Sequence, residues 1–106
     1  PRVVATLWED EGTLLFTVQL NGVSVTRRED NHMVNASALL KAAGWSTERA
    51  EGRLEGEEVR HVVEGACSEY LDGVWVPFSE AMDIANEAGV VEGLYPLFVY
   101  NLGALL

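Results

Sequence analysis

The chain contains 106 residues, of which 48% are hydrophobic, enough for one domain around one core. Its formal net charge of −10 argues against tight, charge-driven binding to a polyanion or to an anionic membrane surface. A single cysteine excludes an internal disulfide, and His32 and His61 do not complete a zinc site at useful spacing. No apolar run approaches the roughly 18 residues of a membrane span, and no leader opens the chain. We therefore expect one domain over residues 1–106, with no membrane association, metal or cofactor.

The chain opens with three β-rich segments joined by turns. The first turn is acidic, and the second is Asn21-Gly22, a strong hairpin signal because a type I′ turn needs positive φ at both central positions. Valine alternates with Ser24 and Thr26 in the third segment, which places these hydroxyl side chains on the solvent-facing side. We expect a meander of two hairpins, with strands at residues 3–8, 13–20 and 23–28.

The next predicted element is a helix with one buried face. Its apolar residues recur at i, i+3, i+4 and i+7 from Ala36. Asn35 can accept a hydrogen bond from the free N–H groups of the first turn, and Gly44 can adopt the left-handed conformation just past the end. Ser46 is a second capping residue, so a new helix begins after about two residues. Helices joined so tightly form a helix-turn-helix.

The second helix is predicted over residues 46–57 and mainly faces solvent. Ala50 and Leu54 are its clear inward-facing residues, and two glycines weaken it. Strands at residues 59–64 and 74–76 follow, with a glycine-bounded loop between them. Such a hairpin after a helix-turn-helix forms a wing.

The last third of the chain is predicted to be helical. Pro77 begins a helix at the position where its missing N–H costs least, and Gly89 ends it. A final helix is expected from about residue 90, with a kink or a break at Pro96. The Leu-rich tail offers a further interaction surface if exposed, although packing on the last helix is expected; it comprises Leu102, Leu105 and Leu106.

Several arginine, aromatic and histidine residues have structural explanations. Arg27 and Arg28 end a strand beside two acidic residues, so they either approach phosphate or form surface ion pairs of small value. Trp45 and Trp75 lie in apolar contexts and are expected in the core. His61, in a predicted strand, is expected to be a structural histidine.

No arrangement typical of catalysis occurs in the sequence. It contains no glycine-rich phosphate cradle, no paired metal ligands and no Ser or Cys nucleophile with a His and an acid at suitable spacing. Cys67 has small and acidic neighbours rather than basic ones, which predicts an unreactive thiol. The chain is therefore not expected to be an enzyme.

Five short segments, spread over nearly the whole chain, match one known domain in the same order and spacing. They are RREDNHMVNA at residues 27–36, Gly44 before the second helix, VRHVV at residues 59–63, GVWVP at residues 73–77 and LYPLF at residues 94–98. Together they resemble the APSES domain, the fungal branch of the KilA-N type DNA-binding modules. The opening VVATLWEDE further resembles the developmental-regulator subgroup of that family.

The resemblance implies an α+β winged helix-turn-helix with a small antiparallel or mixed sheet, in a nuclear transcription regulator of fungi. The second helix, residues 46–57, would face the major groove of double-stranded DNA, and the wing, residues 61–76, would lie along the duplex. The candidate DNA-contacting residues carry side chains suited to base edges or phosphates. They are Thr47, Arg49, Arg53, Arg60, His61 and Ser68.

The charge of the second helix and wing departs from the family pattern, which is rich in lysine and arginine. Residues 46–73 contain eight acidic and three basic residues, a net charge of −5 (3 − 8). A carboxylate placed where a phosphate contact is expected adds repulsion. Two hypotheses follow: a DNA-binding domain whose direct affinity is weakened by its acidic face, or an interaction module on the same fold that meets a basic protein partner.

Overall fold

The computed structural model describes residues 2–99 and 101–105, and only the backbone of residues 104 and 105. A six-stranded sheet in the order β1-β2-β3-β4-β6-β5 forms the centre of the fold, and every neighbouring pair of strands is antiparallel. The sequence left open whether the sheet is antiparallel or mixed, and the structure shows that it is antiparallel. The strands are β1 (Val3–Trp8), β2 (Thr13–Leu20), β3 (Val23–Arg28), β4 (Val34–Asn35), β5 (His61–Val63) and β6 (Gly73–Val76).

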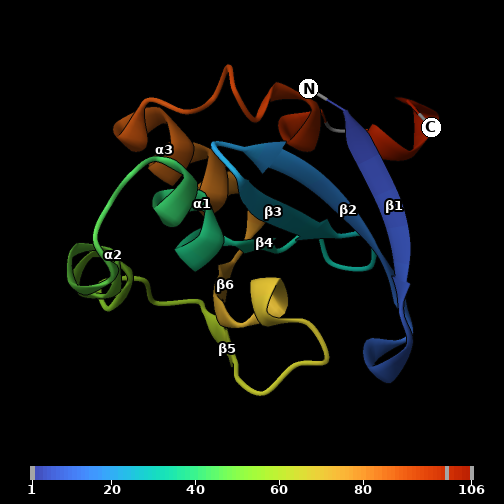
Figure 1. Cartoon of the computed structure of the whole chain (residues 1–106), viewed down its shortest axis with the longest axis horizontal. Coiled ribbons are helices and arrows are strands. Elements are labelled where there is room, and N and C mark those ends of the chain that lie inside the picture. Colours follow the sequence, from blue (N-terminus) through green and yellow to red (C-terminus); the bar gives the residue numbers. More distant parts are fainter. Residues whose placement is uncertain (1, 100, 106) are drawn as a thin grey trace.

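The first three strands form the predicted meander (Figure 1). Asn21 and Gly22 both have positive φ, 52° and 77°, between the paired residues Leu20 and Val23. The Asn21 amide also donates to the Ala42 carbonyl at 2.8 Å, which fixes the β2–β3 turn to the first helix. The local turn signal is therefore supported by a contact 21 residues away along the chain.

Three α-helices and four short 3-10 helices complete the described structure. Asn35 accepts from the Ala38 N–H and Ser46 from the Arg49 N–H, both at 3.2 Å, so both predicted caps are confirmed. Gly44 and Gly89 have positive φ after the first and third α-helices. The helices are α1 (Ala36–Ala42), α2 (Thr47–Leu54), α3 (Phe78–Ala88), η1 (Glu9–Glu11), η2 (Glu69–Leu71), η3 (Tyr95–Phe98) and η4 (Leu102–Leu105).

Several predicted boundaries are wrong. The second helix ends at Leu54 rather than at residue 57, consistent with the flexible backbone of Gly56. Pro77 is the residue before α3 rather than its first residue. The final helix is absent from residues 90–99, where turns lead into η3, because the residue before Pro96 is disfavoured in the α conformation. The two-residue strand β4 was not predicted, since a pattern of two residues carries no periodicity.

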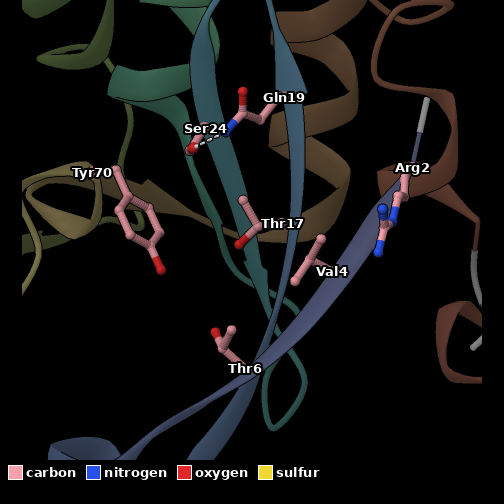
Figure 2. A pocket seen from close by; sticks show the side chains of 7 residues that line it. All are labelled: Arg2, Val4, Thr6, Thr17, Gln19, Ser24 and Tyr70. Carbon is pink, nitrogen blue, oxygen red and sulfur yellow. Dashed lines mark hydrogen bonds between the residues drawn. The ribbon is translucent and has the colours of Figure 1, made fainter.

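The faces of the meander differ in what covers them. α1 and α3 pack on one face, where Phe16, Val18 and Val25 belong to the main core. The opposite face has a hollow of about 460 Å³. Figure 2 shows Tyr70 of η2 across this hollow from the strands. Thr26 is fully buried on this face, contrary to the predicted exposure, because η2 packs against β3. Its hydroxyl is satisfied by that of Thr17 at 2.9 Å.

A second, smaller core joins the meander to the wing. It contains Trp8, Leu15, Leu71 and Trp75, and the two indole rings stack with centroids 5.8 Å apart. The Trp75 Nε1–H donates to the Leu71 carbonyl at 2.9 Å, so its polar atom is satisfied inside the core. The predicted burial of Trp75 is confirmed. The wing is therefore packed against the sheet and is not a free loop.

Arg27 is buried, which corrects the prediction of a surface arginine. Its guanidinium donates to the carbonyls of Leu97 and Val99 at 3.0 and 2.7 Å, and burial lowers its pKa. The last segment of the chain is thus tied to β3. Arg28, in contrast, forms an ion pair with the neighbouring Asp30 at 2.7 Å, as one of the two predictions has it, and a second pair with Glu11 at 2.9 Å that was not predicted.

The Leu-rich tail is only partly described. Leu102 is 2% exposed and packs into the main core, as expected for a tail that folds back. The side chain of Leu105 and all of Leu106 lie outside the described residues. Within the described ranges, no helix has the length and apolar character needed to cross a bilayer.

Candidate nucleic-acid interface

α1 and α2 form a helix-turn-helix that leaves α2 on the outside (Figure 1). Leu39 and Leu40 of α1 are fully buried, whereas α2 buries only Ala50 and Leu54. Both of these inward-facing residues of α2 were predicted from the sequence. The remaining surface of α2 faces solvent and carries the candidate contacts Thr47, Arg49 and Arg53.

The wing is anchored to the beginning of α1 by side chains. Besides capping α1, the Asn35 amide donates to the carbonyls of Tyr70 and Asp72 at 3.0 and 2.9 Å. Ser37 accepts from the Val74 N–H at 2.8 Å. Gly73, with φ +136°, allows this close approach, because a Cβ there would lie 2.7 Å from the Ser37 Cβ. The helix-turn-helix and the wing are therefore held in one fixed arrangement.

Replacing Asn35 with aspartate is expected to reduce the free energy of unfolding by about 2 kcal/mol. Aspartate preserves the helix cap but has no amide donor for the Tyr70 and Asp72 carbonyls. Chemical denaturation followed by tryptophan fluorescence measures the change. Asn31→Asp is the matched control, since Asn31 is exposed and its side chain accepts from the Met33 N–H, a bond that aspartate preserves. Equal stability of both variants would contradict a buried anchoring role for Asn35.

Arg49 is the exposed cation of α2. Its guanidinium carbon lies 3.7 Å from the centroid of the Trp45 ring, a cation–π contact that holds the side chain against the turn between α1 and α2. Trp45 is half-buried, so its predicted place in the core is only partly right: it packs on the core and also presents a surface to Arg49. This second contact was not predicted, although a spacing of four residues brings the two side chains close.

Arg53 is half-buried and is held by two carboxylates. Its Nη1 donates to Glu57 and its Nε to Glu87 of α3, both at 2.9 Å, and its side chain is 30% exposed. These hydrogen bonds, first that of Glu57 and then that of Glu87, raise the pKa of Arg53. Arg49 and Arg53 thus differ in their surroundings, although a spacing of four residues along α2 allows both to project from one helix face.

The remaining candidates lie at the end of α2 and in the wing. Arg60 is exposed and its Nη1 donates to the Leu54 carbonyl at 3.0 Å, so it satisfies the last turn of α2. His61 is exposed on β5, opposite Trp75 on β6, rather than enclosed as a structural histidine. Ser68 is half-buried immediately before η2. Of the three, the structure therefore places His61 and Ser68 in the wing and joins Arg60 to α2 by a hydrogen bond.

A groove of about 510 Å³ is lined by residues of α1, α2, the β2–β3 hairpin and the wing. Thr47 lines it together with the aromatic rings of Trp45 and Tyr70. Lys41 is the one basic residue among those lining the groove, against the three carboxylates of Glu51, Glu69 and Asp72. The described residues contain no group of three or more His, Cys, Asp or Glu side chains placed to hold a metal ion.

Comparison with known proteins identifies close relatives. No family profile matches the chain. The cell pattern formation-associated protein stuA of Dothistroma septosporum is 57% identical over all 106 residues, which are 18% of that protein's length. STUA of Colletotrichum gloeosporioides is 56% identical over the same residues, 17% of its length. The chain belongs to the APSES family. This APSES domain accordingly spans less than a fifth of the length of these relatives.

Solved structures share the fold of this APSES domain. Mbp1 from Saccharomyces cerevisiae has a TM-score of 0.80 and 28% identity, over 92% of this chain and all of the other. The DNA complex of PCG2 has a TM-score of 0.80 over 92% of this chain and 88% of the other, and at 24% identity it is a likeness of fold alone. The predicted family and fold class are confirmed. None of the named proteins is described as an enzyme, in agreement with the prediction.

Proposed function

We propose that this APSES domain is the DNA-binding domain of a fungal nuclear transcription regulator. In this proposal α2 enters the major groove and the wing, residues 61–76, lies along the duplex. The proposal is supported by the StuA relatives and by a fold shared with a protein solved as a DNA complex. It treats residues 1–106 as one domain, because the main core draws on both the meander and the last segment.

The observation that carries the proposal is the exposed guanidinium of Arg49. This residue is exposed on the outer helix, and Trp45 holds its guanidinium 3.7 Å from the ring. Among the described candidate residues, it is the arginine for which the structure gives neither a carboxylate nor a carbonyl partner, so its donors are available to a phosphate or a guanine. Because the Trp45 ring already restricts the Arg49 side chain, less conformational entropy is lost when Arg49 binds a phosphate or a guanine.

The acidic residues of α2 and the wing are expected to weaken this contact. The net charge of −5 over residues 46–73 leaves few positive groups to release counterions. The proposed domain therefore binds DNA with an unusually shallow dependence on salt. If one to three phosphates are neutralised, the slope of log K against log salt concentration is about −1 to −3.

Fluorescence anisotropy of a labelled pool of random duplexes, over a salt series, tests the proposal. Arg49→Gln is expected to weaken binding by roughly three- to tenfold and to reduce the magnitude of the salt slope by about 0.9. Arg2→Gln, which removes an exposed arginine from the N-terminal end, is the matched control and should change binding little. Failure of the unmodified domain to bind any duplex at low salt would overturn the proposal.

A second candidate function is supported by the groove between the helices and the wing. Its three carboxylates and single lysine suit a basic protein segment better than a phosphate. On this alternative, the domain binds an arginine- and lysine-rich peptide through Glu51 and Glu69. Glu51→Gln with Glu69→Gln should then weaken binding of an oligo-arginine peptide, whereas Glu9→Gln with Glu92→Gln should not. If both double substitutions weaken peptide binding equally, the peptide is attracted non-specifically by the negative charge of the whole chain, and this alternative is overturned.

A further inference from the structure

Arg53 is the cation of α2 that carboxylates already hold. Its Nη1 contacts the Glu57 Oε1 and its Nε contacts the Glu87 Oε2, each at 2.9 Å. Glu57 is four residues further along the chain, while Glu87 lies on α3, 34 residues away. Two carboxylates from different elements therefore converge on one guanidinium.

These contacts use the donors that nucleic acid needs. A guanidinium recognises phosphate or guanine through pairs of parallel N–H groups in a rigid fork. Nε is directed at Glu87, so the fork that Nε forms with Nη2 can bind a phosphate only if that bond breaks. The second fork, formed by Nη1 and Nη2, lies beside the Glu57 carboxylate that Nη1 contacts. A phosphate must also approach two fixed negative charges. Arg53 thus contributes little to DNA binding while both bonds are formed.

We propose that Glu57 and Glu87 form a carboxylate clamp that withholds Arg53 from DNA and thereby limits the affinity of α2. This inference rests on the proposed DNA-binding function and extends it, because it assigns a role to Glu87 on a helix outside the proposed interface. The clamp sets affinity by competition: DNA gains the Arg53 contact only by displacing Glu87 or Glu57. Any change that neutralises these carboxylates strengthens binding.

Stabilisation of the fold does not account for the clamp. The Arg53 side chain is 30% exposed, that of Glu87 47% and that of Glu57 14%. Ion pairs with solvent access contribute little to stability, and pairs four residues apart on a helix also contribute only modestly. Removing the two carboxylates is therefore expected to shift the Tm by no more than about 8 °C. The effect on DNA binding is expected to be much larger, because it restores a complete cation to α2.

The test uses Glu57→Gln with Glu87→Gln, which preserves side-chain shape and removes two negative charges. Glu9→Gln with Glu92→Gln is the matched control, since both residues are exposed and lie outside α2, α3 and the wing. In a salt series, the clamp variant is expected to bind duplex DNA roughly tenfold tighter than the control, with a salt slope steeper by about 0.9. Adding Arg53→Gln should abolish the gain in the clamp variant but change the unmodified domain little.

An independent readout is hydrogen exchange at the Arg53 Nε–H in the domain without DNA. The clamp predicts slower exchange at Arg53 than at Arg49, and loss of that difference in Glu87→Gln. If the unmodified domain and all variants fail to bind DNA, the proposed function is overturned. If they bind but the clamp variant does not exceed the control, or Arg53 exchanges as fast as Arg49, the clamp alone is overturned.

Discussion

Replacing Arg27 with alanine is expected to lower the free energy of unfolding by about 4 kcal/mol, the largest effect of any single substitution proposed for this chain. Arg27 is 1% exposed, and its guanidinium contacts His32 and lies 4.5 Å from the centroid of the Phe78 ring. Alanine leaves the Leu97 and Val99 carbonyls without this donor, and each unsatisfied buried group costs about 1–3 kcal/mol. Lost packing adds to that cost.

Two further variants separate the causes of this loss. Arg27→Met keeps much of the side-chain volume and removes the donors, so it measures the hydrogen bonds. Arg27→Lys keeps the charge but cannot reproduce the planar fork, and an intermediate loss is expected. Urea denaturation followed by tryptophan fluorescence measures all three against Arg2→Ala, a change at an exposed arginine. Stability of Arg27→Ala within 1 kcal/mol of the unmodified chain would show that the last segment does not depend on this contact.

Local signals in the sequence were sufficient for most of the fold. The Asn21-Gly22 turn, the two helix caps and the paired anchors Ala50 and Leu54 each depend on neighbouring residues, and the structure has all of them. The prediction of a last α-helix was wrong because the apolar residues around Tyr95 have the spacing of a buried helix face. Tyr95 is in fact 64% exposed, and the proline after it limits the backbone.

The features that set the properties of the candidate interface are long-range, and the sequence did not reveal them. Arg27 binds carbonyls 70 and 72 residues away, so a strand-end arginine was mistaken for a surface group. The contact between Arg53 and Glu87 spans 34 residues and two helices. Composition predicted the acidic character of α2 and the wing correctly, but it could not tell which carboxylates hold which arginines.

The second large effect is expected on DNA affinity, which the charge of α2 and the wing should control. Replacing four exposed acidic residues with lysine should strengthen duplex binding by roughly two orders of magnitude near physiological salt, because each lysine removes a repulsion and can neutralise a phosphate. The net charge of residues 46–73 changes from −5 to +3, since each exchange adds two charges. The replaced residues are Glu51, Glu55, Glu64 and Glu69.

The position of these charges, rather than their number, is the point of the experiment. A control with lysine at Glu9, Asp10, Glu29 and Glu92 gives the whole chain the same net charge, −2, from exposed sites outside α2 and the wing. If the helix-turn-helix and the wing form the DNA-binding surface, the first variant should have the steeper salt slope, by about 3 to 4. If both variants bind equally, DNA binding depends on the net charge of the chain and not on one particular surface. Because Asn35, Ser37 and Gly73 hold the wing against α1, the engineered lysines act from a fixed geometry. A difference between the variants therefore reports where the duplex lies.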